Sequence, residues 1–79
     1  MTCCRYEDFR LLEELGHAES VDWDLGTCER CGGFLLRQWS EYAPSSVYVD
    51  KLTPAEGAAF RDSRDRERVM LLKRWYADH

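Results

Sequence analysis

The first apolar residues of the chain recur at three-residue steps. Tyr6, Phe9, Leu12 and Leu15 follow this spacing, with acidic residues between them. Apolar residues three or four positions apart share one face of a helix. A glycine just past the last apolar position is a common helix stop, and Gly16 stands there. The pattern predicts an amphipathic helix from Tyr6 to Leu15.

Three later segments have the pattern of strands. Apolar and polar residues alternate in residues 21–26, which predicts a strand with one apolar face. Residues 34–42 follow a turn rich in cysteine and glycine and are expected to form the second strand of a hairpin. The Ala-Pro-Ser-Ser sequence at 43–46 predicts a turn. Residues 47–52 are rich in β-formers and predict a third strand.

The sequence after the third strand has the features of a helix start. Thr53 can cap the helix, Pro54 suits the first helical position, and Glu56 can bond back to the cap. The first helix should cover Ala55 to Phe60, with Gly57 as its weak point.

A second C-terminal helix is expected from about Asp65 to Ala77, after the polar residues 62–66. Val69, Leu72 and Trp75 are spaced three apart and predict its buried face. Trp75 is therefore expected in the core.

These elements predict a single small domain over residues 1–79 of the α+β class. A small three-stranded antiparallel sheet with a zinc-knuckle-like hairpin would be packed by an N-terminal helix and one or two C-terminal helices. At 79 residues, only about 60% of the unfolded surface is buried on folding. A metal ion, a disulfide or a partner is therefore an expected source of stability.

Charge is distributed unevenly along an acidic chain. The net charge is −4 and the pI is about 5.1, which disfavours a general nucleic-acid binder. Residues 1–60 carry 5 Lys/Arg and 11 Asp/Glu, a net of −6, and residues 61–79 carry 6 and 4, a net of +2. The acidic part is suited to a basic protein partner.

The sequence contains neither a secretory signal nor an apolar run long enough to span a membrane. A cytoplasmic location is therefore expected, where cysteine thiols stay reduced. That compartment favours a metal site over disulfides.

Cys28 and Cys31 have the spacing of a zinc knuckle, and Gly32 follows directly. Two small buried thiols or a redox pair are the alternatives. A thioredoxin-like pair would open a helix within a βαβ unit, whereas this pair lies between two expected antiparallel strands.

Structural zinc takes four ligands, so the knuckle needs two more. Cys3 and Cys4 are the expected source, which gives a structural zinc site of Cys3, Cys4, Cys28 and Cys31. Adjacent cysteines chelate less easily than a CxxC pair, so His17 is an alternative to one of them.

The sequence Trp-Asp-Leu-Gly-Thr-Cys-Glu-Arg-Cys-Gly at 23–32, with the strand that follows it to residue 42, resembles zinc ribbons. The whole layout, including the Leu-Thr-Pro-Ala-Glu sequence at 52–56, is similar to immunity proteins of polymorphic toxin systems. The second resemblance implies a small bacterial protein that neutralises a toxin by binding it.

Catalytic motifs do not occur in the sequence, which has no nucleophile elbow, phosphate loop or His-Glu metalloprotease motif. The expected function is non-enzymatic protein binding, with a toxin or another basic enzyme as the partner. Trp39 and Tyr42 are the candidate contact residues, because exposed Trp and Tyr dominate binding hot spots.

Two other functions remain open at the level of sequence. A zinc-ribbon-like nucleic-acid or transcription accessory protein would use Arg61, Arg64 and Arg68, which helical spacing places on one face. A thiol redox protein would use Cys28 and Cys31.

Overall fold

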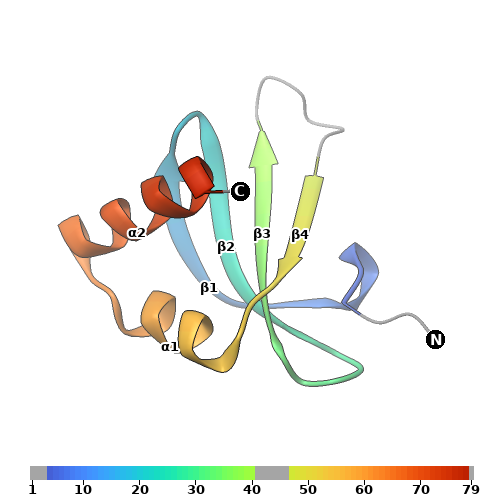
Figure 1. Cartoon of the computed structure of the whole chain (residues 1–79). Helices are drawn as coiled ribbons and strands as arrows, with labels where there is room; N and C mark the ends of the chain where they lie inside the picture. Colours follow the sequence, from blue (N-terminus) through green and yellow to red (C-terminus); the bar gives the residue numbers. More distant parts are fainter. Residues whose placement is uncertain (1–3, 41–46, 79) are drawn as a thin grey trace.

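The sheet of the computed structural model is antiparallel, with strands in the order β1-β2-β3-β4 (Figure 1). The structure describes residues 4–40 and 47–78. The elements in chain order are η1 (Tyr6–Asp8, a 3-10 helix), β1 (Phe9–Ala18), β2 (Val21–Cys28), β3 (Phe34–Ser40), β4 (Val47–Lys51), α1 (Pro54–Asp62) and α2 (Asp65–Asp78). Both α-helices pack on the same face of the sheet.

The N-terminal segment does not form the helix that its apolar spacing predicts. It forms η1 and β1, so the prediction of three strands and an N-terminal helix is wrong, and the sheet has four strands. β1 contains two bulges, at which Leu12 and Leu15 are the extra residues opposite β2. Because a bulge lengthens the two-residue repeat to three, Leu15 and Ala18 are both buried. In this bulged strand, two residues three positions apart share the buried face, as residues three apart do in a helix.

The elements after β1 lie where the sequence predicts them. The three strands expected between residues 21 and 52 are β2, β3 and β4, and the two expected C-terminal helices are α1 and α2. The predicted cap of α1 is confirmed: Thr53 Oγ1 accepts from the Glu56 N–H at 3.1 Å, and the Glu56 carboxylate accepts from the Thr53 N–H at 2.9 Å. Residues 41–42 of the expected second strand and the turn at 43–46 lie outside the described residues.

A two-residue turn joins β1 to β2. Its central residues, Glu19 and Ser20, have φ angles of 56° and 61°. Two consecutive positive φ values are those of a type I′ turn, whose twist matches that of the flanking strands. Neither residue is a glycine, and a side chain makes positive φ angles unfavourable, so the turn is strained.

Trp23 lies at the centre of the core between the sheet and the helices, with its side chain fully buried. Its indole N–H donates to the Ala18 carbonyl at 2.9 Å, and its ring meets Tyr76 edge-on at 6.3 Å. Trp75 is buried, as expected, and packs edge-on against Phe60 at 6.1 Å. These aromatic contacts hold α1 and α2 on the sheet.

The prediction that Val69 lies on the buried face of α2 is wrong. Val69 is exposed, whereas Leu72 and Trp75 are buried. The side of α2 that faces the core runs through Arg68, Leu71, Leu72 and Trp75, and Val69 lies beside this side rather than on it.

Arg68 stabilises the junction of α1 and α2, where the chain leaves the helix after Asp62 and re-enters at Asp65. Its guanidinium donates to the carbonyls of Phe60 and Ser63 and pairs with Glu13 of β1. Arg64 donates to the carbonyls of Arg61 and Ser63. The expected single basic face of Arg61, Arg64 and Arg68 is therefore wrong: the three residues belong to two helices and the link between them, and two of them bind backbone carbonyls.

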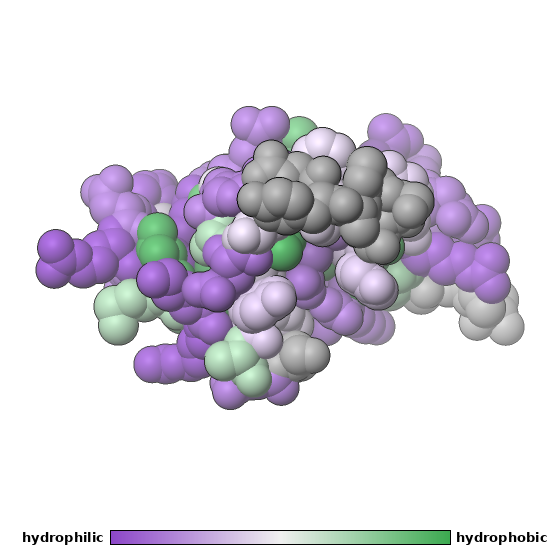
Figure 2. All heavy atoms as spheres, turned by 90° about the horizontal axis from the view of Figure 1, so that it is seen from above, coloured by the Kyte–Doolittle hydropathy of each residue, from purple (hydrophilic) through white to green (hydrophobic). Residues whose placement is uncertain are grey.

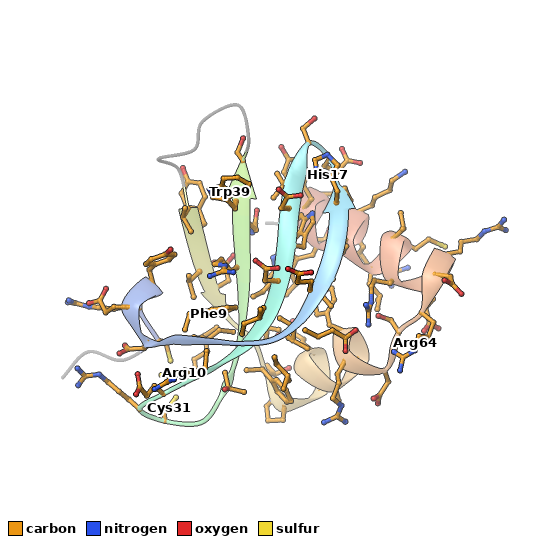
Figure 3. The ribbon with its side chains drawn as sticks, turned by 180° about the vertical axis from the view of Figure 1, so that it is seen from behind. Phe9, Arg10, His17, Cys31, Trp39 and Arg64 are labelled. Carbon is orange, nitrogen blue, oxygen red and sulfur yellow. The ribbon has the colours of Figure 1, made fainter. Side chains whose placement is uncertain are left out.

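Within residues 4–40 and 47–78, no α-helix lies over the opposite face of the sheet (Figure 3). Near its lower end the Phe9 ring lies so close to Gly26 that a Cβ there would come within 2.5 Å of it. The Arg37 guanidinium stacks on the Phe9 ring at 4.4 Å and pairs with Asp24 at 2.6 Å. This helix-free face therefore carries a polar and aromatic surface.

No helix in residues 4–40 or 47–78 is both long and apolar enough to cross a membrane.

Candidate metal centre

The knuckle is a tight turn between β2 and β3. The Cys28 N–H donates to the Gly33 carbonyl and the Gly32 N–H donates to the Cys28 carbonyl, each at 2.8 Å. Gly32 has a φ of 76°, which a glycine adopts without strain. The turn places Cys28 in the interior and Cys31 at the surface.

The N-terminal segment supplies a third sulfur. The Cys4 Sγ lies 3.5 Å from the Cys31 Sγ, and the Cys4 N–H donates to the Cys28 Sγ at 3.3 Å. The three sulfur atoms all lie within 4.8 Å of one another. Cys4, Cys28 and Cys31 are thus close enough to hold a metal ion.

Asp8 brings the N-terminal segment to the knuckle. Its buried carboxylate accepts from the Arg30 Nε at 2.9 Å and from the Arg5 N–H at 3.2 Å. Its carbonyl accepts from the Glu29 N–H at 2.8 Å. The Arg30 guanidinium beside Asp8 is the main reason that the pKa of this carboxyl lies below its usual range. A second ion pair, Arg10 with Glu29 at 2.6 Å, lies close by on the surface.

The environment of Cys28 favours the thiolate, which is the form that binds metals. Burial alone would raise the pKa of this thiol. The backbone N–H groups of Cys31, Arg30 and Cys4 outweigh that effect, with a contribution from the Cys31 thiol, and lower the pKa to about 6.

The donor set fits zinc. Sulfur ligands at about 2.3 Å from zinc in a tetrahedron lie about 3.8 Å apart, close to the spacing of these sulfurs. Thiolates select soft and borderline metals such as zinc over calcium or magnesium. Cys3 lies outside the described residues.

His17 is not near the sulfurs. It lies at the far end of the β1–β2 hairpin, paired with Asp22, whereas Cys28 pairs with Phe9 at the other end. Its Nδ1 lies 2.9 Å from the Asp22 Oδ1. Figure 3 shows His17 and Cys31 at opposite ends of the sheet, so the structure removes His17 as an alternative ligand.

Trp39 lies on the helix-free face of β3, at the end of the sheet away from the cysteines (Figure 3). Its side chain is 39% exposed. It borders a shallow hollow of about 220 Å³ with Tyr6, Asp24, Arg37 and Val47. Tyr42, the other expected contact residue, lies outside the described residues.

Sequence reasoning missed the residues that assemble the site around the sulfurs. Asp8 is one of the acidic residues between the apolar positions of the predicted N-terminal helix, and Arg30 lies inside the CxxC motif. Only the strand pairing of residues 9 and 28 brings them together. The opposite charges of Asp8 and Arg30 were the only signal of this contact in the sequence, and many other acidic and basic residues could be paired in the same way.

Comparisons with protein-family models, with curated proteins and with solved structures found no match.

Proposed function

We propose that this chain is a non-enzymatic protein-binding module, stabilised by structural zinc, that inhibits a basic partner such as a toxin by covering its surface. The observation that carries the proposal is the division of the sheet into two ends. Cysteines gather at one end, and an exposed tryptophan on the helix-free face lies at the other.

Zinc would act as a structural ion here. The N-terminal segment and the β2–β3 turn are distant in sequence, and a zinc ion held by Cys4, Cys28 and Cys31 would join them. Cys3 is the proposed fourth ligand, because closed structural sites have four. Structural zinc contributes on the order of 10 kcal/mol of binding energy that is coupled to folding, which would support a small core.

The end of the sheet that carries Trp39 is the proposed contact surface. Trp39 projects from one face of β3, and Tyr48, from the other face of the neighbouring strand, is also exposed. Figure 2 shows this end of the molecule from above as largely hydrophilic, with isolated apolar side chains. Exposed aromatic anchors within a polar rim are typical of protein interfaces.

The expected partner is basic because the chain carries a net charge of −4. Glu14, Asp22 and Asp24 border a second hollow, which lies between His17 and Trp39 on the same face. The resemblance to immunity proteins of polymorphic toxin systems agrees with an inhibitor of this charge.

The nucleic-acid alternative is less well supported. Arg64 and Arg68 bind carbonyls at the α1–α2 junction, so fewer cations are available for phosphates. The redox alternative is disfavoured because the CxxC pair lies between antiparallel strands rather than at the start of a helix.

The test is affinity capture from the native host with a matched pair of variants. Trp39→Ala removes the proposed anchor, and Met70→Ala removes an exposed side chain of α2 as the control. We expect one basic protein to be retained by the wild type and the control and lost with Trp39→Ala. The association rate of the purified pair should fall as salt rises. Retention of nucleic acid alone, or equal retention by all three proteins, would refute the proposal.

A further inference from the structure

A third hollow lies on the helix side of the sheet, near the end of α2. It measures about 460 Å³ and is lined by Gln38, Tyr48, Asp50 and Tyr76. A neighbouring hollow of about 240 Å³ shares Gln38, Tyr48 and Tyr76 and extends to Glu19 at the β1–β2 turn. The two form one groove, because they share three lining residues.

The groove combines carboxylates with a lack of cations. Asp50 and Glu19 are its acidic groups, and of the described residues that line it none is Lys or Arg. The Gln38 amide donates to Asp50 Oδ2 at 3.1 Å, which orients the carboxylate. In the described residues, neither carboxylate forms an ion pair.

Two tyrosine rings stand in the groove. Tyr48 is 63% exposed and Tyr76 is 48% exposed. The Tyr76 ring is held edge-on against the buried Trp23, so its orientation is set by the core. The faces of tyrosine rings attract cations, and an ordered ring loses little freedom when a ligand binds.

We propose that this groove binds an arginine side chain presented by the basic partner. The guanidinium would stack on tyrosine and donate to the Asp50 carboxylate, the pairing for which its planar, forked geometry is suited. The inference rests on the proposed function for the identity of the partner, but the groove itself is testable alone. It assigns a second contact, across the sheet from Trp39.

A guanidinium fits this groove better than an ammonium. It is more weakly hydrated than the ammonium of lysine, so it loses less on leaving water, and it stacks on aromatic faces. It can also satisfy a carboxylate and a nearby carbonyl or hydroxyl at once because it has five N–H donors.

The test is an NMR titration of the full chain with N-acetyl-arginine methylamide as the probe. The citrulline analogue, which has nearly the same shape without the charge, and the lysine analogue are the comparison ligands. We expect dissociation constants on the order of millimolar for arginine, with shifts centred on Gln38, Tyr48, Asp50 and Tyr76. Citrulline should bind at least tenfold more weakly.

Two variants localise the effect. Asp50→Asn should weaken the arginine analogue about tenfold, whereas Glu67→Gln, which removes an exposed carboxylate from α2, should leave its binding unchanged. Equal binding of citrulline or lysine, shifts centred elsewhere, or an unaffected Asp50→Asn would each overturn the inference.

The same variants separate this inference from the proposed function. If a partner is captured through Trp39 and Asp50→Asn binds it as tightly as the wild type, the arginine site is wrong and the function stands. If the arginine analogue binds as expected but no basic protein is captured, the function is wrong and the site stands.

Discussion

Single residues determine how closely the layers of this protein approach. Gly57 in α1 lies directly over β3, where a Cβ would come within 2.1 Å of the Phe34 ring. Sequence reasoning treated this glycine as a weak point of the helix, which is correct for an isolated helix. In the folded protein the absent side chain provides the space into which Phe34 packs.

Gly57→Ala should therefore destabilise the protein despite the better helix propensity of alanine. Alanine gains about 1 kcal/mol in the helix, but overpacking typically costs about 1–3 kcal/mol, and this contact is severe. We expect a net loss in the free energy of unfolding, measured by urea denaturation. In a Phe34→Leu background the same change should cost less, and an equal or greater cost there would contradict the packing explanation.

Asp8 predicts a pH dependence that can be measured. Its pKa is lowered in the folded protein, so its ionised form stabilises the fold at every pH above the unfolded value of about 3.9. This contribution is lost as the pH falls from that value through the lower folded pKa. The difference in unfolding free energy between wild type and Asp8→Asn should be largest near neutral pH and shrink below about pH 4. A difference that stays constant down to pH 2 would show that the ion pair contributes nothing.

At the level of elements, the sequence was sufficient where its local signals agreed. The capping box of α1, the alternation of β2 and the β-formers of β4 all predicted the right structure. The prediction for the N-terminal segment failed because its apolar residues are three apart in the sequence, as in a helix, whereas the segment pairs with β2 as a strand interrupted by two bulges. A bulge depends on the partner strand, so the segment alone could not reveal it. The same misreading hid the placement of Asp8 beside the knuckle.

The β1–β2 turn is the element with the clearest strain. Replacing Glu19-Ser20 by Asn-Gly should stabilise the protein by about 1 kcal/mol, because these residues adopt positive φ angles at little cost. Thermal unfolding measures the gain. Ser20→Ala keeps a side chain at the strained position and should give no gain. If Asn-Gly failed to raise the melting temperature, the turn would not be strained as described.

At the scale of the whole molecule, the helices and the cysteine cluster lie at different parts of the sheet. α1 and α2 bury Trp23, Leu25 and Leu36 on one face of the sheet. The cysteines lie at one end, where they join the N-terminal segment to the knuckle. CxxC spacing predicted half of this centre. The sequence also predicted Cys4 beside this pair, and the structure brings the three sulfurs together. The exclusion of His17 required the fold, because it depends on which end of the β1–β2 hairpin His17 occupies.

Zinc content measured by native mass spectrometry, on protein purified without added metal, tests the central claim most directly. We expect one zinc ion per chain in the wild type and in a Glu67→Gln control, and loss of zinc together with the folded state in Cys28→Ser. Chelation should unfold the wild type, and added zinc should restore it. A wild-type protein that is fully folded without metal, and whose mass and stability do not change when zinc is added, would contradict the account.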